Sequence, residues 1–275
     1  MEVSMLGLGN KKLFLFDIDG TIALGSKFFD GSYQLLSYIE KELGKAYFIS
    51  NNSTKSEQDY AKSFWANFRY RVTPNRFVTS GYVTVEYLKQ HFRNGRIFLI
   101  GTKSFQQALT NQGFTVTDAP DYSVDCVLVA FDQELTYRKL ENACSILANT
   151  NVPFLATNPD LRCPMTTSYI PDCGAICQML TSTIGKVPIY LGKPSRTICD
   201  ICMERTHYSP EETLVVGDRL YTDIACGINA GVETCVLYSG EATPEEVARS
   251  EYKPTYAFDN VRQLYEALQT ASSQA

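Results

Sequence analysis

The chain has 275 residues, of which 44% are hydrophobic and 20% charged, a composition that is ordinary for a folded globular protein and excludes an intrinsically disordered one. The net charge of -5 and the pI near 5.2 predict no basic surface that would bind nucleic acid or an anionic membrane. Because no apolar run approaches the ~20 residues of a membrane span and no signal-peptide pattern is present, we expect a soluble, cytoplasmic protein with free thiols.

Short apolar runs alternate with amphipathic stretches, which predicts βα units and a mainly parallel sheet. Buried strands are expected at 13–16, 47–49, 214–216 and 234–237. Apolar residues recur at helical spacing between the first two of these strands: Leu35, Leu36, Ile39 and Leu43. Gly44 follows as a C-cap, so this part of the chain is predicted to form a βαβ unit.

Three helix starts are predicted where a hydroxyl side chain precedes a glutamate by three residues. The pairs are Thr54 with Glu57, Ser209 with Glu212, and Thr243 with Glu246. We expect a helix to begin directly after each hydroxyl residue.

Two carboxylates, Asp17 and Asp19, directly follow the run 13–16, and Gly20 then allows a sharp turn. In an open α/β sheet, ligands bind beyond the carboxyl ends of the strands, so both acids are expected in a functional site. A solvated Asp-Gly turn would explain the glycine but not the apolar run that leads into two acids. A calcium loop is excluded because its sixth position, which must be glycine, is Ile22.

The second expected strand ends in Ser50-Asn51-Asn52, directly before a predicted helix. The hydroxyl and nearby backbone N–H groups can hold a phosphoryl oxygen, although such clusters are more often helix caps. Further along, Lys193 lies between a strand-like run and Pro194, where we expect a helix to begin. A lysine at this place can neutralise carboxylates and phosphate, although most single lysines are solvated surface residues.

The run 214–216 leads into Asp218, and Asp223 follows five residues later. Together with Asp17 and Asp19, these acids cannot crowd together in ionised form without a cation, because like charges raise one another's pKa. Mg²⁺ is the expected cofactor, since it prefers oxygen ligands and leaves positions for water and phosphate.

The pair Cys199 and Cys202 raises the question of a zinc or thiol redox site. No second pair or flanking histidine accompanies it, and both cysteines fall on a predicted helix. Core packing is the better explanation.

Four segments resemble, in order, the four motifs of the haloacid dehalogenase superfamily: Phe16-Asp17-Ile18-Asp19-Gly20-Thr21, Ile49-Ser50-Asn51-Asn52, Gly192-Lys193-Pro194 and Val216-Gly217-Asp218-x-x-x-x-Asp223. Two further segments are similar to parts of its NagD-like subfamily, which includes p-nitrophenyl, nucleotide, phosphoglycolate and pyridoxal phosphatases: Thr157-Asn158-Pro159-Asp160 and Pro171-Asp172-Cys173-Gly174. The resemblance extends essentially from Lys12 to Leu237.

The resemblance implies that Asp17 is a nucleophile that forms an aspartyl-phosphate. Asp19 would protonate the leaving oxygen and then activate the water that hydrolyses the intermediate. Ser50 and Lys193 would hold the transferring phosphoryl oxygens.

By the same resemblance, Mg²⁺ would be bound by Asp17, Asp218 and the backbone carbonyl of Asp19. Asp223 would act through a water molecule or orient the other ligands. Three further residues are expected to support the site or contact the phosphoryl group: Gly20, Asn51 and Asn52.

The spacing of the motifs predicts two domains. Only 30 residues separate Asp19 from Ser50, enough for one helix and one strand, whereas 142 lie between Ser50 and Lys193. We therefore expect a Rossmann-like parallel-sheet α/β core at 1–81 and 189–275, interrupted by an inserted α/β domain at 82–188. The resemblance to the NagD-like subfamily implies that this insertion is a C2-type cap. Within the insertion, strands are expected at 97–100, 126–130 and 153–156 and a helix at 136–148.

The inserted domain is expected to select the substrate. Asn158, Asp160 and Arg162 are candidates for contacts with the leaving group, although a turn stabilised by Asn-Pro-Asp explains the first two equally well.

The function expected from the motifs is Mg²⁺-dependent hydrolysis of small phosphate monoesters by a phosphatase. A phosphotransferase or phosphomutase would use the same aspartyl-phosphate, and a non-catalytic phosphate sensor would keep the fold without turnover. The expected partner is a small phosphomonoester, and analogy with the family suggests a homodimer.

Overall fold

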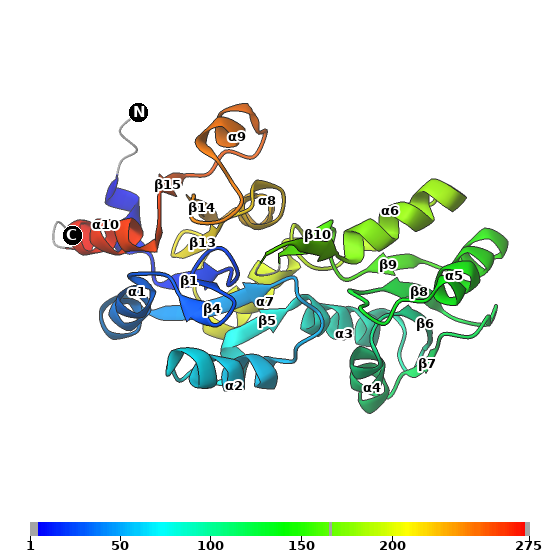
Figure 1. The fold of residues 1–275 in the computed structure, drawn as a ribbon. Helices are drawn as coiled ribbons and strands as arrows, with labels where there is room; N and C mark the ends of the chain where they lie inside the picture. Colours follow the sequence, from blue (N-terminus) through cyan, green and yellow to red (C-terminus); the bar gives the residue numbers. More distant parts are fainter. Residues whose placement is uncertain (1–4, 165–166, 273–275) are drawn as a thin grey trace. The chain divides into compact units, whose positions relative to one another are not determined.

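The computed structural model describes residues 5–164 and 167–272. The chain forms two compact units. The first unit comprises Met1–Ser50, Glu57–Val78 and Pro194–Ala275, and the second comprises Asn51–Ser56 and Thr79–Lys193. The second unit is therefore inserted into the sequence of the first, as the colours of Figure 1 show. The domain limits expected from the sequence, 1–81, 82–188 and 189–275, stay a prediction.

The first unit contains a six-stranded sheet with the order β15-β14-β13-β1-β4-β5. Its strands are β1 (Leu13–Phe16), β4 (Lys45–Ser50), β5 (Phe77–Thr79), β13 (Thr213–Gly217), β14 (Glu233–Leu237) and β15 (Tyr256–Phe258). All four strands expected in this unit are confirmed. β1 runs parallel to both neighbours, and Phe16 pairs with Phe48 on one side and Val216 on the other. The carboxyl ends of β1, β4 and β13 are therefore level.

Helices cover both faces of this sheet (Figure 1). They are α1 (Ser32–Tyr38), α2 (Glu57–Phe68), α7 (Thr197–Thr206), α8 (Ala225–Ala230), α9 (Pro244–Arg249) and α10 (Val261–Ser272). Phe14 and Phe16 pack into a core with apolar residues of α1, α2 and α10. α8 lies against Val215, where a Cβ on Gly227 would be 3.2 Å from its side chain. The helix expected before Gly44 is confirmed, with the π-helical turn Ile39–Leu43 continuing α1.

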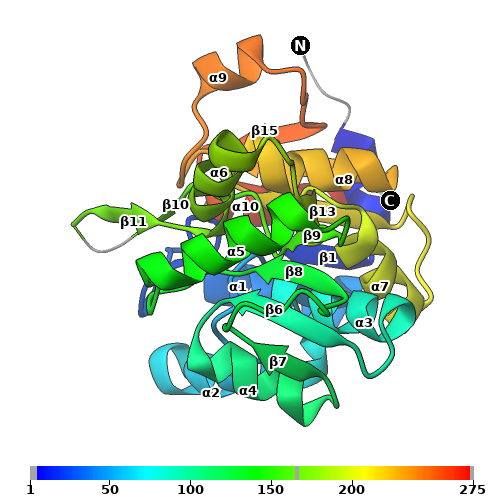
Figure 2. The same cartoon turned by 90° about the vertical axis from the view of Figure 1, so that its right-hand side faces the viewer.

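The second unit has its own five-stranded parallel sheet with the order β12-β9-β8-β6-β7. Its strands are β6 (Arg96–Ile100), β7 (Thr115–Thr117), β8 (Cys126–Val129), β9 (Phe154–Ala156) and β12 (Ile189–Tyr190). Its helices are α3 (Ser80–His91), α4 (Lys103–Asn111), α5 (Tyr137–Asn149) and α6 (Cys173–Ile184). α5 and α6 bury apolar side chains on one face of the sheet, and α4 lies on the other face (Figure 2).

Two small antiparallel hairpins complete the architecture. β2 (Ala23–Leu24) pairs with β3 (Lys27–Phe28) in the first unit, and β10 (Arg162–Pro164) pairs with β11 (Tyr169–Pro171) in the second. The expected Rossmann-like parallel-sheet core with an inserted α/β domain is thus confirmed. Among the described residues, no helix combines the length and the apolar character that crossing a membrane requires.

Only one of the three predicted capping boxes starts a helix. Thr243 accepts a hydrogen bond from the backbone of Glu246, whose side chain binds back to Thr243, at the start of α9. The prediction at Thr54 was wrong, because its hydroxyl and backbone N–H both donate to Asn52 Oδ1 and α2 begins only at Glu57.

The predicted helix start at Ser209 was also wrong. Its N–H donates to Glu212 Oε2, which closes a turn. The chain then enters β13 at Thr213, because the apolar run that follows pairs with β1 in the sheet. The same spacing of a hydroxyl residue and a glutamate therefore also occurs in a turn that precedes a β-strand.

The helix expected at Pro194 begins three residues later, at Thr197. The carbonyls of Pro194 and Ser195 accept hydrogen bonds from Asn229 and Cys226 instead of continuing a helix. On α7, Cys199 and Cys202 are fully buried, which confirms core packing, and burial raises the pKa of the Cys202 thiol. The nine cysteines all lie among the described residues, and none of them forms a disulfide bond.

Candidate active site

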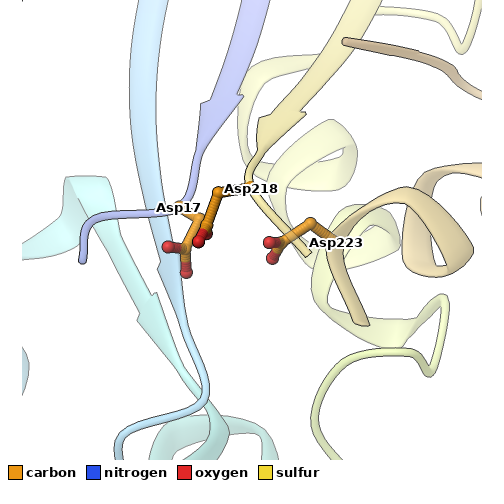
Figure 3. Close-up of side chains that lie close together, drawn as sticks. All are labelled: Asp17, Asp218 and Asp223. Carbon is orange, nitrogen blue, oxygen red and sulfur yellow. The ribbon is translucent and has the colours of Figure 1, made fainter. Parts of the chain in front are cut away.

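Three carboxylates converge at the carboxyl ends of β1 and β13 in the first unit. Asp17 directly follows β1, Asp218 follows β13, and Asp223 lies in the π-helical turn Leu220–Ile224. Each offers an oxygen within 4.8 Å of the others. Figure 3 shows the Asp17 and Asp218 side chains next to each other, with the Asp223 carboxylate pointing toward them.

The Asp218 side chain is held from two sides. Its Oδ2 accepts the backbone N–H of Glu241 at 2.8 Å, and its Oδ1 accepts the Thr21 hydroxyl at 3.3 Å. The same hydroxyl lies 3.5 Å from Asp17 Oδ2, so Thr21 bridges the two acids. These contacts fix Asp218, which is only 3% exposed, in one orientation.

Asp223 is fixed by the turn that carries it. Its Oδ2 accepts the backbone N–H of Arg219 at 3.0 Å, and the residue is only 1% exposed. The Arg219 guanidinium in turn pairs with Glu241 at 3.2 Å. The loop that carries Glu241 therefore supports both Asp218 and the turn before Asp223.

Asp19 is placed differently from the other three acids. Its side chain is exposed, and it is not one of the carboxylates that converge among the described residues. Gly20 follows with φ +98°, and its N–H binds the Ala23 carbonyl at 2.8 Å. A Cβ at Gly20 would overlap the Asp218 carboxylate, so both the backbone conformation and the close approach require glycine here.

The three converging carboxylates suit a hard divalent cation. Each supplies oxygen ligands, and like charges held this close together at buried or half-buried positions repel one another, which favours the binding of a cation. The donor set contains neither thiolate nor imidazole, so it fits Mg²⁺ better than zinc.

Ser50 ends β4 and is nearly buried, at 5% exposure. Its hydroxyl lies 3.0 Å from that of Tyr60, a buried residue of α2 whose ring stacks on Phe77 at 5.5 Å. The stacked ring holds the Tyr60 hydroxyl in place, and that hydroxyl orients Ser50.

Asn51 and Lys193 are joined within the second unit. Lys193 N–H donates to Asn51 Oδ1 at 2.9 Å, and Asn51 Nδ2 donates to the Lys193 carbonyl at 3.1 Å. Lys193 is only 2% exposed. Asn52 has a different role, because its Oδ1 accepts both donors of Thr54 and so shapes the turn that follows.

The residues expected to contact the leaving group lie in two settings within the second unit. Asn158 is fully buried, donates to the Asn51 carbonyl at 2.8 Å and accepts the N–H of Asp160 at 3.0 Å. These bonds are those of a turn-forming asparagine. Arg162 is exposed, and its guanidinium lies 4.6 Å from the centre of the Tyr169 ring.

Sequence reasoning missed three residues that support these groups. Thr21 was visible as the last residue of the first motif, but its hydrogen bonds were not. Tyr60 falls on the buried face of α2, where its hydroxyl gave no signal. Glu241 lies 23 residues beyond Asp218 in the chain, so no local pattern connects them.

Residues 14–115 match the family model of haloacid dehalogenase-like hydrolases, and residues 190–264 match a second model of HAD-hydrolase-like proteins. An acid sugar phosphatase of Staphylococcus haemolyticus is 32% identical over 252 residues, which cover 92% of this chain and 94% of the relative.

Solved structures resemble the chain over nearly its whole length. A 4-nitrophenylphosphatase from Thermotoga maritima has 34% identity and a TM-score of 0.88, and the match covers 96% of this chain and 99% of that one. NagD from E. coli K-12 has 28% identity and a TM-score of 0.81, with 92% and 98% covered.

Proposed function

Because the chain belongs to the haloacid dehalogenase-like hydrolases, and within them to the NagD-like phosphatases, we propose that it hydrolyses small phosphate monoesters with Asp17 as the nucleophile and Mg²⁺ as the cofactor. The observation that carries this proposal is the convergence of Asp17, Asp218 and Asp223 within 4.8 Å. A nucleophilic carboxylate that lies beside two further acids needs a cation to approach an anionic phosphate.

In the first half-reaction, an Asp17 oxygen forms a bond to phosphorus while the bond from phosphorus to the ester oxygen breaks. Asp19 gives its proton to the departing alcohol. In the second half-reaction, Asp19 takes a proton from water, the water oxygen bonds to phosphorus, and the Asp17 carboxylate is released with inorganic phosphate. The exposed position of Asp19 suits a group that first gives and then takes a proton.

Mg²⁺ would be held by Asp17, Asp218 and the backbone carbonyl of Asp19, with Asp223 orienting this set. When bound, the ion offsets the charge of the carboxylates and of the phosphate. The hydrogen bonds from Glu241 and Thr21 support this role of Asp218, because they fix the carboxylate before any ion binds.

The Ser50 hydroxyl and the Lys193 ammonium would hold the phosphoryl oxygens during transfer. Asn51 would act on Lys193 through the two backbone hydrogen bonds. Asn52 would set the turn after Ser50, and Gly20 would leave room for the Asp218 carboxylate.

Sugar phosphates and aryl phosphates are the proposed substrates, since relatives include an acid sugar phosphatase and a 4-nitrophenylphosphatase. Asn158, Asp160 and Arg162 stay our candidates for leaving-group recognition. Arg162 is the strongest of them because its guanidinium is exposed while Asn158 and Asp160 are buried.

The test is phosphate release from sugar phosphates, nucleotides, phosphoglycolate, pyridoxal phosphate and p-nitrophenyl phosphate, with Mg²⁺ or with EDTA. We expect turnover that requires Mg²⁺ and is lost in Asp17→Asn. Asp259→Asn is the control, because Asp259 is an exposed aspartate of the first unit outside the cluster. Turnover by Asp17→Asn at the wild-type rate would overturn the proposal. If the phosphoryl group is transferred only to an added alcohol and no inorganic phosphate is released, a phosphotransferase is favoured.

A further inference from the structure

The sheet of the second unit has a point at which its connections diverge. From β6 the chain crosses to β7 on one side, and it then returns to add β8, β9 and β12 on the other side. α4 follows β6 on one face of the sheet, and α5 follows β8 on the opposite face (Figure 2). In open parallel sheets, ligands bind in the crevice at the carboxyl ends of two strands that diverge in this way.

A cavity of 320 Å³ lies at this place in the second unit. Its lining combines residues that follow β6, β7 and β8 with the first turns of α4 and α5. The residues that matter here are Leu99, Lys103, Gln106, Asp118, Glu134 and Lys139. None of them belongs to the catalytic proposal.

A buried ion pair ties the two sides of the crevice together. Lys139 Nζ lies 2.8 Å from Asp132 Oδ2, and the two side chains are 12% and 0% exposed. The same ammonium donates to the Gly101 carbonyl after β6 at 2.9 Å, and Asp132 Oδ1 accepts the N–H of Glu134 at 2.9 Å. Because buried ion pairs seldom add net stability, this one is better explained as holding the walls of a site rigid.

The N-terminus of α4 is already occupied. Glu134 Oε2 accepts the backbone N–H of Lys103 at 3.0 Å, and the Thr102 hydroxyl caps Phe105. A phosphate group would have to displace this carboxylate. The cavity is therefore not arranged as a phosphate site.

Two opposite charges, both on exposed residues, line this cavity. The Lys103 ammonium and the Asp118 carboxylate form no hydrogen bond or ion pair with other described residues, and they do not pair with each other. The side-chain amide of Gln106 likewise makes no hydrogen bond to the described residues. The cavity thus offers one cationic group, one anionic group and one neutral amide that can both donate and accept.

We propose that this cavity binds a free α-amino acid. Its carboxylate would pair with Lys103, its ammonium with Asp118, and the Gln106 amide would bind one of the two. Leu99, which lines the cavity and is 3% exposed, would contact the apolar part of the ligand. A zwitterion carries one charge for Lys103 and one for Asp118, whereas a purely anionic or neutral ligand could pair with at most one of them.

The test is isothermal titration of the full chain with glycine, L-serine, L-leucine, L-glutamate and L-lysine. We expect saturable binding of at least one of them with one site per chain. Lys103→Met and Asp118→Asn should each weaken it by about tenfold or more, since each removes a charge-assisted contact. Lys89→Met, on α3 outside the cavity, should leave the affinity unchanged.

A ligand without the amino group separates the two contacts. The matching carboxylic acid should bind wild type more weakly than the amino acid does, and Asp118→Asn should not weaken it further. Phosphate release should be unchanged in both cavity variants, so this test stands apart from the catalytic proposal. If none of the five amino acids binds, or if Lys103→Met and Asp118→Asn bind as tightly as the wild type, the inference is overturned. Binding of ribose or glycerol in preference to amino acids would also overturn it.

Discussion

The side-chain amide of Asn51 forms two hydrogen bonds with the backbone of Lys193, accepting its N–H at 2.9 Å and donating to its carbonyl at 3.1 Å. Asn51 directly follows Ser50 in the chain, so the two proposed phosphate-binding residues are linked through one asparagine. An aspartate of the same shape could keep only the first bond, because a carboxylate does not donate.

Asn51→Ala should therefore lower both stability and turnover. It removes both side-chain hydrogen bonds to the backbone of the buried Lys193, which together contribute about 1–3 kcal/mol. Urea unfolding and phosphate release measure the two effects. Asn67→Ala is the control, since Asn67 is exposed on α2 and should change stability by less than about 0.5 kcal/mol. Equal effects of the two substitutions would contradict this role of Asn51.

Tyr60→Phe should reduce kcat/KM several-fold while stability falls by only about 1 kcal/mol, because the stacked ring stays and one hydroxyl is lost. If Tyr60 acts by orienting Ser50, the substitution should have no further effect on activity in a Ser50→Ala background. Steady-state kinetics of the two single variants and the double variant test this non-additivity. Additive losses would show that Tyr60 acts by another route.

Gly20→Ala should abolish activity, and Gly25→Ala is its matched control. Both glycines have positive φ, at +98° and +60°, so alanine meets backbone strain of about 1–2 kcal/mol at either position. Only at Gly20 would the new Cβ also overlap the Asp218 carboxylate, whereas nothing lies within 4 Å of Gly25. Thermal unfolding and phosphate release of both variants separate the two causes. Similar losses in the two would contradict the crowding at Asp218.

Mg²⁺ should raise the melting temperature of the wild type, because a ligand that binds only the folded state stabilises it. The gain should grow with Mg²⁺ concentration and disappear in Asp218→Asn, which removes one charge from the cluster of three. The same variant without Mg²⁺ should be at least as stable as the wild type, since repulsion among the acids is reduced. An equal gain in Asp218→Asn and wild type would place the cation elsewhere.

The sequence predicted the parts of the fold that depend on buried apolar runs. Leu13 to Phe16 and Leu214 to Val216 are short and wholly apolar, which suits buried strands at the centre of a sheet, and the acids that follow them lie together because parallel strands end at one edge. The expected inserted domain follows equally from the long gap between Ser50 and Lys193.

Local signals failed where tertiary contacts decide the conformation. The capping pattern at Ser209 closes a turn because the residues that follow pair in the sheet. α7 begins three residues later than expected because the carbonyls of Pro194 and Ser195 accept hydrogen bonds from α8. The contact of Glu241 with Asp218 joins residues far apart in the chain. Contacts between residues this far apart leave no regular pattern in a single sequence, so they could not be predicted from it.

Asp17 is proposed to carry the phosphoryl group and Asp19 to release it, and rapid mixing of Asp19→Asn with p-nitrophenyl phosphate and Mg²⁺ separates these two roles. Nitrophenolate leaves without needing a proton, but hydrolysis of the intermediate still needs a base. We predict one equivalent of nitrophenol in a burst, followed by near arrest, with the phosphoryl group found by mass spectrometry on the peptide that contains Asp17. Sustained turnover without a burst, or a phosphoryl group on another residue, would contradict the account.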